Sequence, residues 1–203
     1  MPPIIQLRYL ILSLFVFSCF FFPDRSFSIT AAGHVQSGNH FYKQGSYIKA
    51  IQEFTRAIAL KPEFSEAFYF RGLVFGLQKR TERAIKDFSK AIELNPGYTA
   101  AYNNRGSVFL KQGEYRHAIR DFTKVTALDP FNAVAFNNRG LAHESLGMHV
   151  KSTEDFTNAI ELNPEYAEAY INRGVAYSNL GNFTQAIHDH SRAIELNPLD
   201  ASA

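Results

Sequence analysis

The chain has 203 residues, enough for one domain or two small ones, and 46% of them are hydrophobic. Its 21 basic and 19 acidic residues nearly balance, so the composition lacks the concentrated positive charge that marks a nucleic-acid-binding protein. The only cysteine is Cys19, which excludes an intrachain disulfide and a zinc site built from thiolates.

The first thirty residues indicate a targeting segment. Arg8 is the only charge before an uncharged, mostly apolar run from Tyr9 to Phe22, and Pro23-Asp24-Arg25 follows it. The run is shorter than the roughly 20 residues that a membrane-spanning helix needs. A cationic start, a short apolar block and a polar exit predict an export signal over residues 1–30, either cleaved or retained as a membrane anchor.

Cys19 has two interpretations. The stretch Val16-Phe17-Ser18-Cys19 partly resembles a bacterial lipobox, in which the cysteine is acylated, so Cys19 is a candidate lipidation site. However, Phe17 is bulky for that motif, and three phenylalanines follow the cysteine where lipoproteins turn polar. We favour the second interpretation, that Cys19 is a small apolar residue inside the signal.

After the signal, the chain repeats itself every 34 residues. Prolines recur at this interval, as Pro62, Pro96, Pro130, Pro164 and Pro198. A fixed period of 20–50 residues predicts a stacked array of identical structural units. Counting back from each proline divides the rest of the chain into units 31–64, 65–98, 99–132, 133–166 and 167–200.

Each unit has the pattern of two helices. A glycine recurs at Gly38, Gly72, Gly106, Gly140 and Gly174, with a ring-bearing residue four positions before it and three positions after it. Later in each unit a small residue, a ring-bearing residue and another small residue follow one another at the same spacings of four and three. Spacings of three and four line one face of a helix, so each unit is predicted to be a helical hairpin. Glycines between the two segments suit a helix end, and the Asn-Pro or Asp-Pro step stops the second helix.

These spacings resemble the tetratricopeptide repeat family, whose unit also has 34 residues and the same order of ring, glycine, ring, alanine, phenylalanine and proline. The resemblance covers residues 31–200. It implies an all-α, right-handed α-solenoid of five hairpins, in which the first helix of each hairpin lines an inner groove. It further implies a protein or peptide as the partner.

The sequence departs from the family at the residue before the glycine. The family has leucine there, whereas this chain has Arg71, Arg105, Arg139 and Arg173. A buried charge needs a partner, and acids recur sixteen residues later in each unit, as Glu53, Asp87, Asp121, Asp155 and Asp189. The arginine can pair with the acid of its own unit or with that of the preceding unit. We favour the cross-unit pairing, because it explains why the first unit lacks arginine, although it leaves Asp189 unpaired.

Asparagines precede these arginines. Asn104, Asn138 and Asn172 recur one unit apart, and Asn103 and Asn137 add a second amide in two units. A row of carboxamides offers donors and acceptors together, which suits the backbone of an extended peptide. The row is similar to the asparagine ladder in the repeat domain of O-linked N-acetylglucosamine transferases. The alternative is that these amides only solvate a groove wall.

No catalytic constellation is recognisable in the sequence. It has no glycine-rich phosphate loop, and its histidines do not have the spacing of metal ligands. We therefore predict a protein without catalytic residues, cofactor or metal, and with no affinity for nucleic acid.

The predicted function is a non-enzymatic scaffold or adaptor, outside the cytoplasm, that binds a protein or peptide in its concave groove. Two alternatives stay open. One is an envelope assembly factor anchored in the membrane or through a lipid on Cys19. The other is a substrate-recognition module for a separate enzyme. The last repeat lacks the polar capping helix that ends many repeat arrays, so self-association through that end is a further expectation.

Overall fold

A computed structural model describes residues 30–198 of the chain. The predicted export signal, including Cys19, lies outside the described residues except for Thr30. Within this range the chain forms ten α-helices and no strand. The helices are α1 (Ala31–Lys43), α2 (Tyr47–Leu60), α3 (Ser65–Leu77), α4 (Thr81–Leu94), α5 (Thr99–Lys111), α6 (Tyr115–Leu128), α7 (Ala133–Ser145), α8 (His149–Leu162), α9 (Ala167–Asn179) and α10 (Phe183–Leu196).

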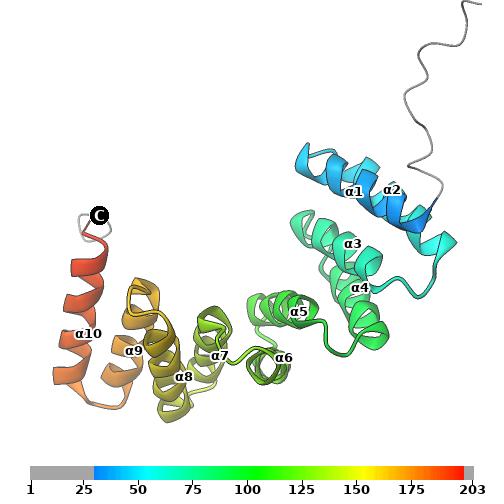
Figure 1. Ribbon diagram of the computed structural model, residues 1–203. Coiled ribbons are helices and arrows are strands. Elements are labelled where there is room, and N and C mark those ends of the chain that lie inside the picture. The colour runs from blue at the N-terminus through cyan, green and yellow to red at the C-terminus, as the bar shows by residue number, and fades with distance from the viewer. Residues whose placement is uncertain (1–29, 199–203) are drawn as a thin grey trace, which may run out of the picture.

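Consecutive helices pair into five hairpins, and each hairpin stacks on the next. The resulting array is curved, with the odd-numbered helices on its inner side and the even-numbered helices on its outer side (Figure 1). The prediction of an all-α solenoid of five repeats is confirmed. Because a hairpin packs against its neighbours in the chain, each one buries its apolar face against the adjacent repeats of the described array.

The two helices of each hairpin cross closely at the recurring glycine. A Cβ atom added to Gly140 would lie only 2.6 Å from a ring carbon of Phe156. The phenylalanine rings at this crossing, Phe54, Phe88, Phe122 and Phe156, are at most 2% exposed. The small residue and the ring therefore act together, since only glycine lets the ring of the second helix lie against the backbone of the first.

Glycines also end the first helix of most hairpins. Gly45 has a φ of 70°, in the left-handed region that side chains other than glycine rarely adopt. The two amides after the helix end, those of Gly45 and Ser46, donate back to Tyr42 and Phe41 and so close a Schellman motif. The second repeat makes the same turn with Lys79, at a φ of 58°.

No helix between residues 30 and 198 is long and apolar enough to cross a membrane. The ten helices have 13 or 14 residues each.

Candidate functional site

The four arginines each form an ion pair inside their own hairpin. The guanidinium of Arg71 donates through Nε and Nη2 to the two carboxylate oxygens of Asp87, at 2.7 and 2.8 Å. The equivalent pairs are Arg105–Asp121, Arg139–Asp155 and Arg173–Asp189, with shortest distances of 2.7, 2.6 and 2.7 Å. Hydrogen bonding to Asp189 raises the pKa of Arg173, although its burial acts in the opposite direction.

The predicted cross-unit pairing is therefore wrong, and so is the expectation that Asp189 is unpaired. The reason lies in the crossing of the two helices. A Cβ atom on Gly72 would lie 3.3 Å from Cβ of Asp87, so the aspartate starts beside the residue that follows Arg71. The arginine reaches its own hairpin's acid with a short, bidentate contact.

The arginine does contact the preceding repeat, but through a hydroxyl. Nη1 of Arg105 donates to Oγ of Ser89 at 2.9 Å, and Nη1 of Arg71 donates to Oγ1 of Thr55 at 3.1 Å. Arg139 and Arg173 make the corresponding bonds, to Thr126 at 2.9 Å and to Thr157 at 3.1 Å. Each guanidinium thus joins three helices from two repeats.

These hydroxyls were missed from the sequence, although they carry a signal. A serine or threonine recurs every 34 residues, as Thr55, Ser89, Thr123, Thr157 and Ser191. In the third repeat the hydroxyl of Thr123 lies 3.4 Å from Nη1 of Arg139. This nitrogen donates over a shorter distance, 2.9 Å, to the hydroxyl of Thr126.

The first repeat holds its acid by other means. Glu53 receives a bond from Nδ1 of His34 at 2.7 Å and another from Arg56, one turn further along α2. Arg71 does not contact Glu53, so the expected pair between them does not form. His34 occupies a ring position of the repeat, and there it provides the contact to the acid that arginine provides in the other hairpins.

The inner face holds a hollow of about 710 Å³ between α3 and α5. Its apolar lining comes from Tyr42, Leu73 and Leu77, and its polar lining includes Asn104, Ser107, Lys111 and Gln112. Leu77 is 55% exposed, which leaves an apolar contact available to a ligand.

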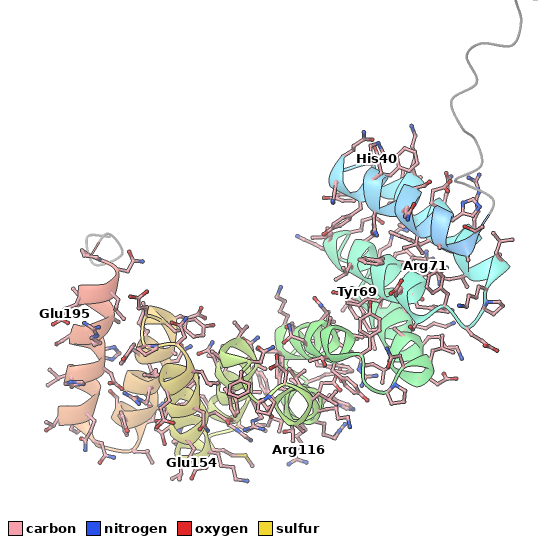
Figure 2. The ribbon with its side chains drawn as sticks, in the orientation of Figure 1. His40, Tyr69, Arg71, Arg116, Glu154 and Glu195 are labelled. Atoms are coloured by element: carbon pink, nitrogen blue, oxygen red, sulfur yellow. The ribbon has the colours of Figure 1, made fainter. Side chains whose placement is uncertain are left out.

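Asn104 links the first helices of two neighbouring repeats. Its Nδ2 donates to the backbone oxygen of Ala100 at 2.8 Å and to the hydroxyl of Tyr69 at 3.3 Å. Burial raises the pKa of Tyr69, and the bond from Asn104 opposes that shift only partly. Figure 2 labels Tyr69 on α3, one of the helices on the inner side of the array. The amide nitrogen is used internally, so the Oδ1 of Asn104 is the atom left for a ligand.

Asn137 is not a groove residue, contrary to the prediction. It is 0% exposed, and its Oδ1 accepts a bond from Nδ2 of Asn172 at 3.0 Å. This contact lies between α7 and α9, so the side chain belongs to the joint between two repeats. The sequence did not reveal the difference, because Asn137 and the half-buried Asn103 occupy the same place in their repeats.

The other two asparagines keep free polar groups. Asn138 is half-buried, and its side-chain amide forms no hydrogen bond with any residue in the range 30–198. Oδ1 of Asn103 is shielded from solvent and accepts no hydrogen bond from that part of the chain. Of the five predicted groove residues, Asn104 lines the hollow and Asn138 keeps a free amide, while Asn137 and Asn172 bond to each other.

A cluster of polar groups around Glu144 was not expected from the sequence. Its carboxylate accepts from Ser152, from Nδ2 of Asn179 at 2.6 Å and from Nδ1 of His149 at 2.8 Å. Burial alone would raise the pKa of Glu144, but these bonds outweigh it and lower the pKa. The serine bonds to the carboxylate and not to the imidazole, so the cluster has the form of a structural joint and not of an activated nucleophile.

No group of three or more potential metal ligands among histidine, cysteine, aspartate and glutamate occurs in the described part of the chain.

Two family models match this chain over most of its length. The family model described as tetratricopeptide repeat matches residues 65–98, 99–132, 133–166 and 167–199, and a second model, described as TPR repeat, matches residues 38–79. No curated protein matches the sequence.

Several solved structures share the fold. MamA from Desulfovibrio magneticus RS-1 is 23% identical, with a TM-score of 0.78 over 83% of this chain and 95% of that one. Another MamA structure is 25% identical, with a TM-score of 0.77 over 82% of this chain and 97% of that one. YrrB, described as a TPR protein with an unusual peptide-binding site, is 21% identical, with a TM-score of 0.76 over 83% and 87%.

Proposed function

Because this chain belongs to the tetratricopeptide repeat family, we propose that it is a non-enzymatic scaffold or adaptor that binds a protein or peptide in its inner groove. The observation that carries the proposal is the hollow between α3 and α5, where exposed apolar and polar side chains lie together. YrrB, which has a similar fold, is described as having a peptide-binding site, and this supports the same use of the fold here.

The chemistry of the hollow fits an extended peptide. A peptide backbone presents an amide donor and a carbonyl acceptor at every residue. The Oδ1 of Asn104 can accept from such a donor, and Lys111 can donate to a carbonyl oxygen. Leu73 and Leu77 provide an apolar contact for a side chain of the ligand. Further along the groove, the free amide of Asn138 continues the same pattern.

The test is selection of a random peptide library on the full chain, followed by measurement of the affinity of the selected peptides. Two variants are compared with the wild type. The groove variant is a double substitution, Asn138→Ala with Leu77→Glu, and the outer-face control is the single substitution Asn158→Ala. Asn104 is left intact because it also joins two helices. We expect the groove variant to lose at least about tenfold in affinity and the outer-face control to be unchanged.

Circular dichroism of both variants excludes loss of fold as the cause. If the selected peptides bind the folded groove variant as tightly as the wild type, the inner groove is not the binding site.

We further propose that the protein is exported, on the basis of the signal predicted over residues 1–30. A fusion of the full chain to alkaline phosphatase, which is active only outside the cytoplasm, tests this. The expected result is activity that disappears when an arginine pair replaces two residues of the apolar run. Palmitate labelling that is lost in Cys19→Ala would favour a lipid-anchored assembly factor over an unanchored adaptor.

The exposed side of α10 supports self-association. Ile187 and Ile194 are 67% and 53% exposed there. Ser191 occupies the position of the hydroxyls that receive an arginine in earlier repeats, yet no arginine of the described residues reaches it. Sedimentation velocity tests this, with a dimer expected for the wild type and a monomer for Ile187→Glu. A wild type that stays monomeric at all concentrations would contradict it.

A further inference from the structure

The outer face of α4 and α6 carries positive charges that are not engaged in ion pairs with the described residues. Five exposed residues form it: Arg83 and Lys86 on α4, and Arg116, Arg120 and Lys124 on α6. We call these five residues the basic face. The three on α6 are four residues apart and so lie along one side of that helix. No member of the basic face forms an ion pair with any residue between 30 and 198.

The acids of the same two helices do not compensate this charge. Asp87 and Asp121 point inward and are already paired with Arg71 and Arg105. Asp121 is the only acid of α6. On α4, Glu93 is engaged by Lys90, which leaves Glu82 as the single unpaired acid of the two helices.

This charge is not a general property of the repeat. The position of Lys86 and Arg120 is occupied in α8 by Glu154, and that of Lys124 by Asn158. Figure 2 shows Arg116 and Glu154 both on the outer side of the array, on α6 and α8. The repeat therefore tolerates either sign of charge at this face, and its fold does not require the basic residues.

A furrow next to the basic face adds an apolar component. It has a volume of about 780 Å³ and lies over α3, between α2 and α4. Ile51, Phe68 and Phe75 line it, together with Arg83 and Lys86 of the basic face. Its two acids are both paired with cations of the same lining, Asp87 with Arg71 and Glu93 with Lys90. The guanidinium of Arg83 lies 5.7 Å from the centre of the Phe75 ring. The corresponding hollow between α8 and α9, of about 480 Å³, is lined by Thr153, Glu154, Thr157, Asn158 and Tyr177 and has no cation.

We infer that the basic face and this furrow bind an acidic peptide segment of a protein partner, with one apolar or aromatic side chain of that segment in the furrow. The unpaired cations on α4 and α6 attract and orient the carboxylates. The furrow is a recess, which suits an inserted side chain. A membrane surface would instead need apolar side chains that protrude, and on α6 the only exposed large apolar residue is Leu128. The site is separate from the inner groove and does not depend on it.

The probe for this site is a short fluorescein-labelled peptide of glutamates with one central phenylalanine, followed by fluorescence anisotropy with the full chain. We expect binding that weakens steeply with added salt. A probe with glutamine in place of glutamate should not bind, and glycine in place of phenylalanine should weaken binding.

Two charge-reversed variants locate the site. Lys86→Glu with Arg120→Glu should weaken binding of the probe at least about tenfold. The matched control is Lys151→Glu with Arg192→Glu, which makes the same change in net charge on α8 and α10 and should leave the affinity within about twofold. Thermal melts establish that both are folded; if the first is not, Lys86→Gln with Arg120→Gln replaces it.

Three results would overturn the inference. The first is equal binding of the glutamate and glutamine probes, and the second is an equal loss of affinity in both charge-reversed variants. The third comes from sedimentation with vesicles of phosphatidylglycerol and of phosphatidylcholine. The basic face recognises a lipid surface instead if three observations coincide. Only the anionic vesicles bind, the charge-reversed variant on α4 and α6 abolishes that binding, and the peptide probe does not bind.

Discussion

The first repeat and the four that follow it hold the acid of their second helix in different ways. In the later repeats one arginine binds the aspartate with two nitrogens and uses its third to reach a hydroxyl of the preceding repeat. In the first repeat, which follows no other described repeat, His34 and Arg56 bind Glu53 and no arginine is present before the glycine.

This difference shows what the arginine contributes. An acid inside a hairpin can be held by any nearby cation or imidazole, as Glu53 demonstrates. The link to the preceding repeat needs a group that holds the acid and extends past it, and a planar guanidinium with five donors meets that need. The arginine that replaces the family's leucine is thus a joint between repeats, and the first repeat, which has no described repeat before it, holds its acid without one.

Removal of one such arginine should have the largest effect. Arg105→Ala leaves Asp121 buried without its partner, and we expect it to lower the free energy of unfolding by about 3–5 kcal/mol. Urea unfolding followed by circular dichroism measures the loss.

The double variant Arg105→Leu with Asp121→Ala restores the apolar residue of the family and removes the buried charge. It should recover much of the stability, because an apolar pair can replace a buried ion pair at little cost. A single variant that loses less than about 1 kcal/mol would mean that the pair is not a joint but a solvated contact.

The link between repeats can be tested alone through its hydroxyl. Ser89→Ala removes the acceptor for Nη1 of Arg105, and we expect a loss of about 1–2 kcal/mol in the free energy of unfolding. Ser191→Ala is the matched control, since this serine has the same place in the last repeat but receives no arginine from the described residues. It should change stability by less than about 0.5 kcal/mol. Equal effects at both positions would show that the hydroxyl acts only within its own helix.

The joint between the last two repeats should respond to acid. Because the pKa of Glu144 is lowered in the folded protein, its carboxylate stabilises the fold above its unfolded pKa of roughly 4.3. That contribution disappears as the pH falls through the lower, folded value. Glu144→Gln should therefore reduce the melting temperature at neutral pH, and the difference from the wild type should shrink as the solution is acidified. Glu154→Gln, at an exposed glutamate, is the control and should show no such pH dependence.

The smallest effect is expected when the missing arginine is supplied to the first repeat. In Ser37→Arg the new guanidinium would meet a Glu53 that His34 and Arg56 already hold, and there is no earlier repeat in the described chain to reach. We expect a change below about 0.5 kcal/mol in the free energy of unfolding. A gain above about 1 kcal/mol would mean that the arginine stabilises a hairpin without any link to a preceding repeat.

Much of the fold could be predicted from the sequence. The spacing of prolines, glycines and rings led to five helical hairpins, because helical periodicity and the backbone limits of proline and glycine act locally. The turn glycine at Gly45 and the helix stop before Pro96 follow from the same local rules, as does the close crossing at Gly140.

Less of the candidate site could be predicted from the sequence. Asn104 and Asn138 were found because the same residue type recurs before the arginines, whereas the position of Thr55 and Ser89 is threonine in some repeats and serine in others, so no single residue type marks it. The burial of Asn137 could not be predicted, since it depends on how closely α7 and α9 approach and on Asn172 opposite.

By itself, then, the sequence determined the unit, its two helices and the number of hairpins. Only the tertiary structure decided which acid each arginine binds. In a repeating chain the acid sixteen residues ahead of Arg105 and the acid eighteen residues behind it are both one helix away, so no pattern along the chain separates Asp121 from Asp87. The choice depends on where two helices cross, and that crossing is set by Phe122 packing against Gly106 within one hairpin.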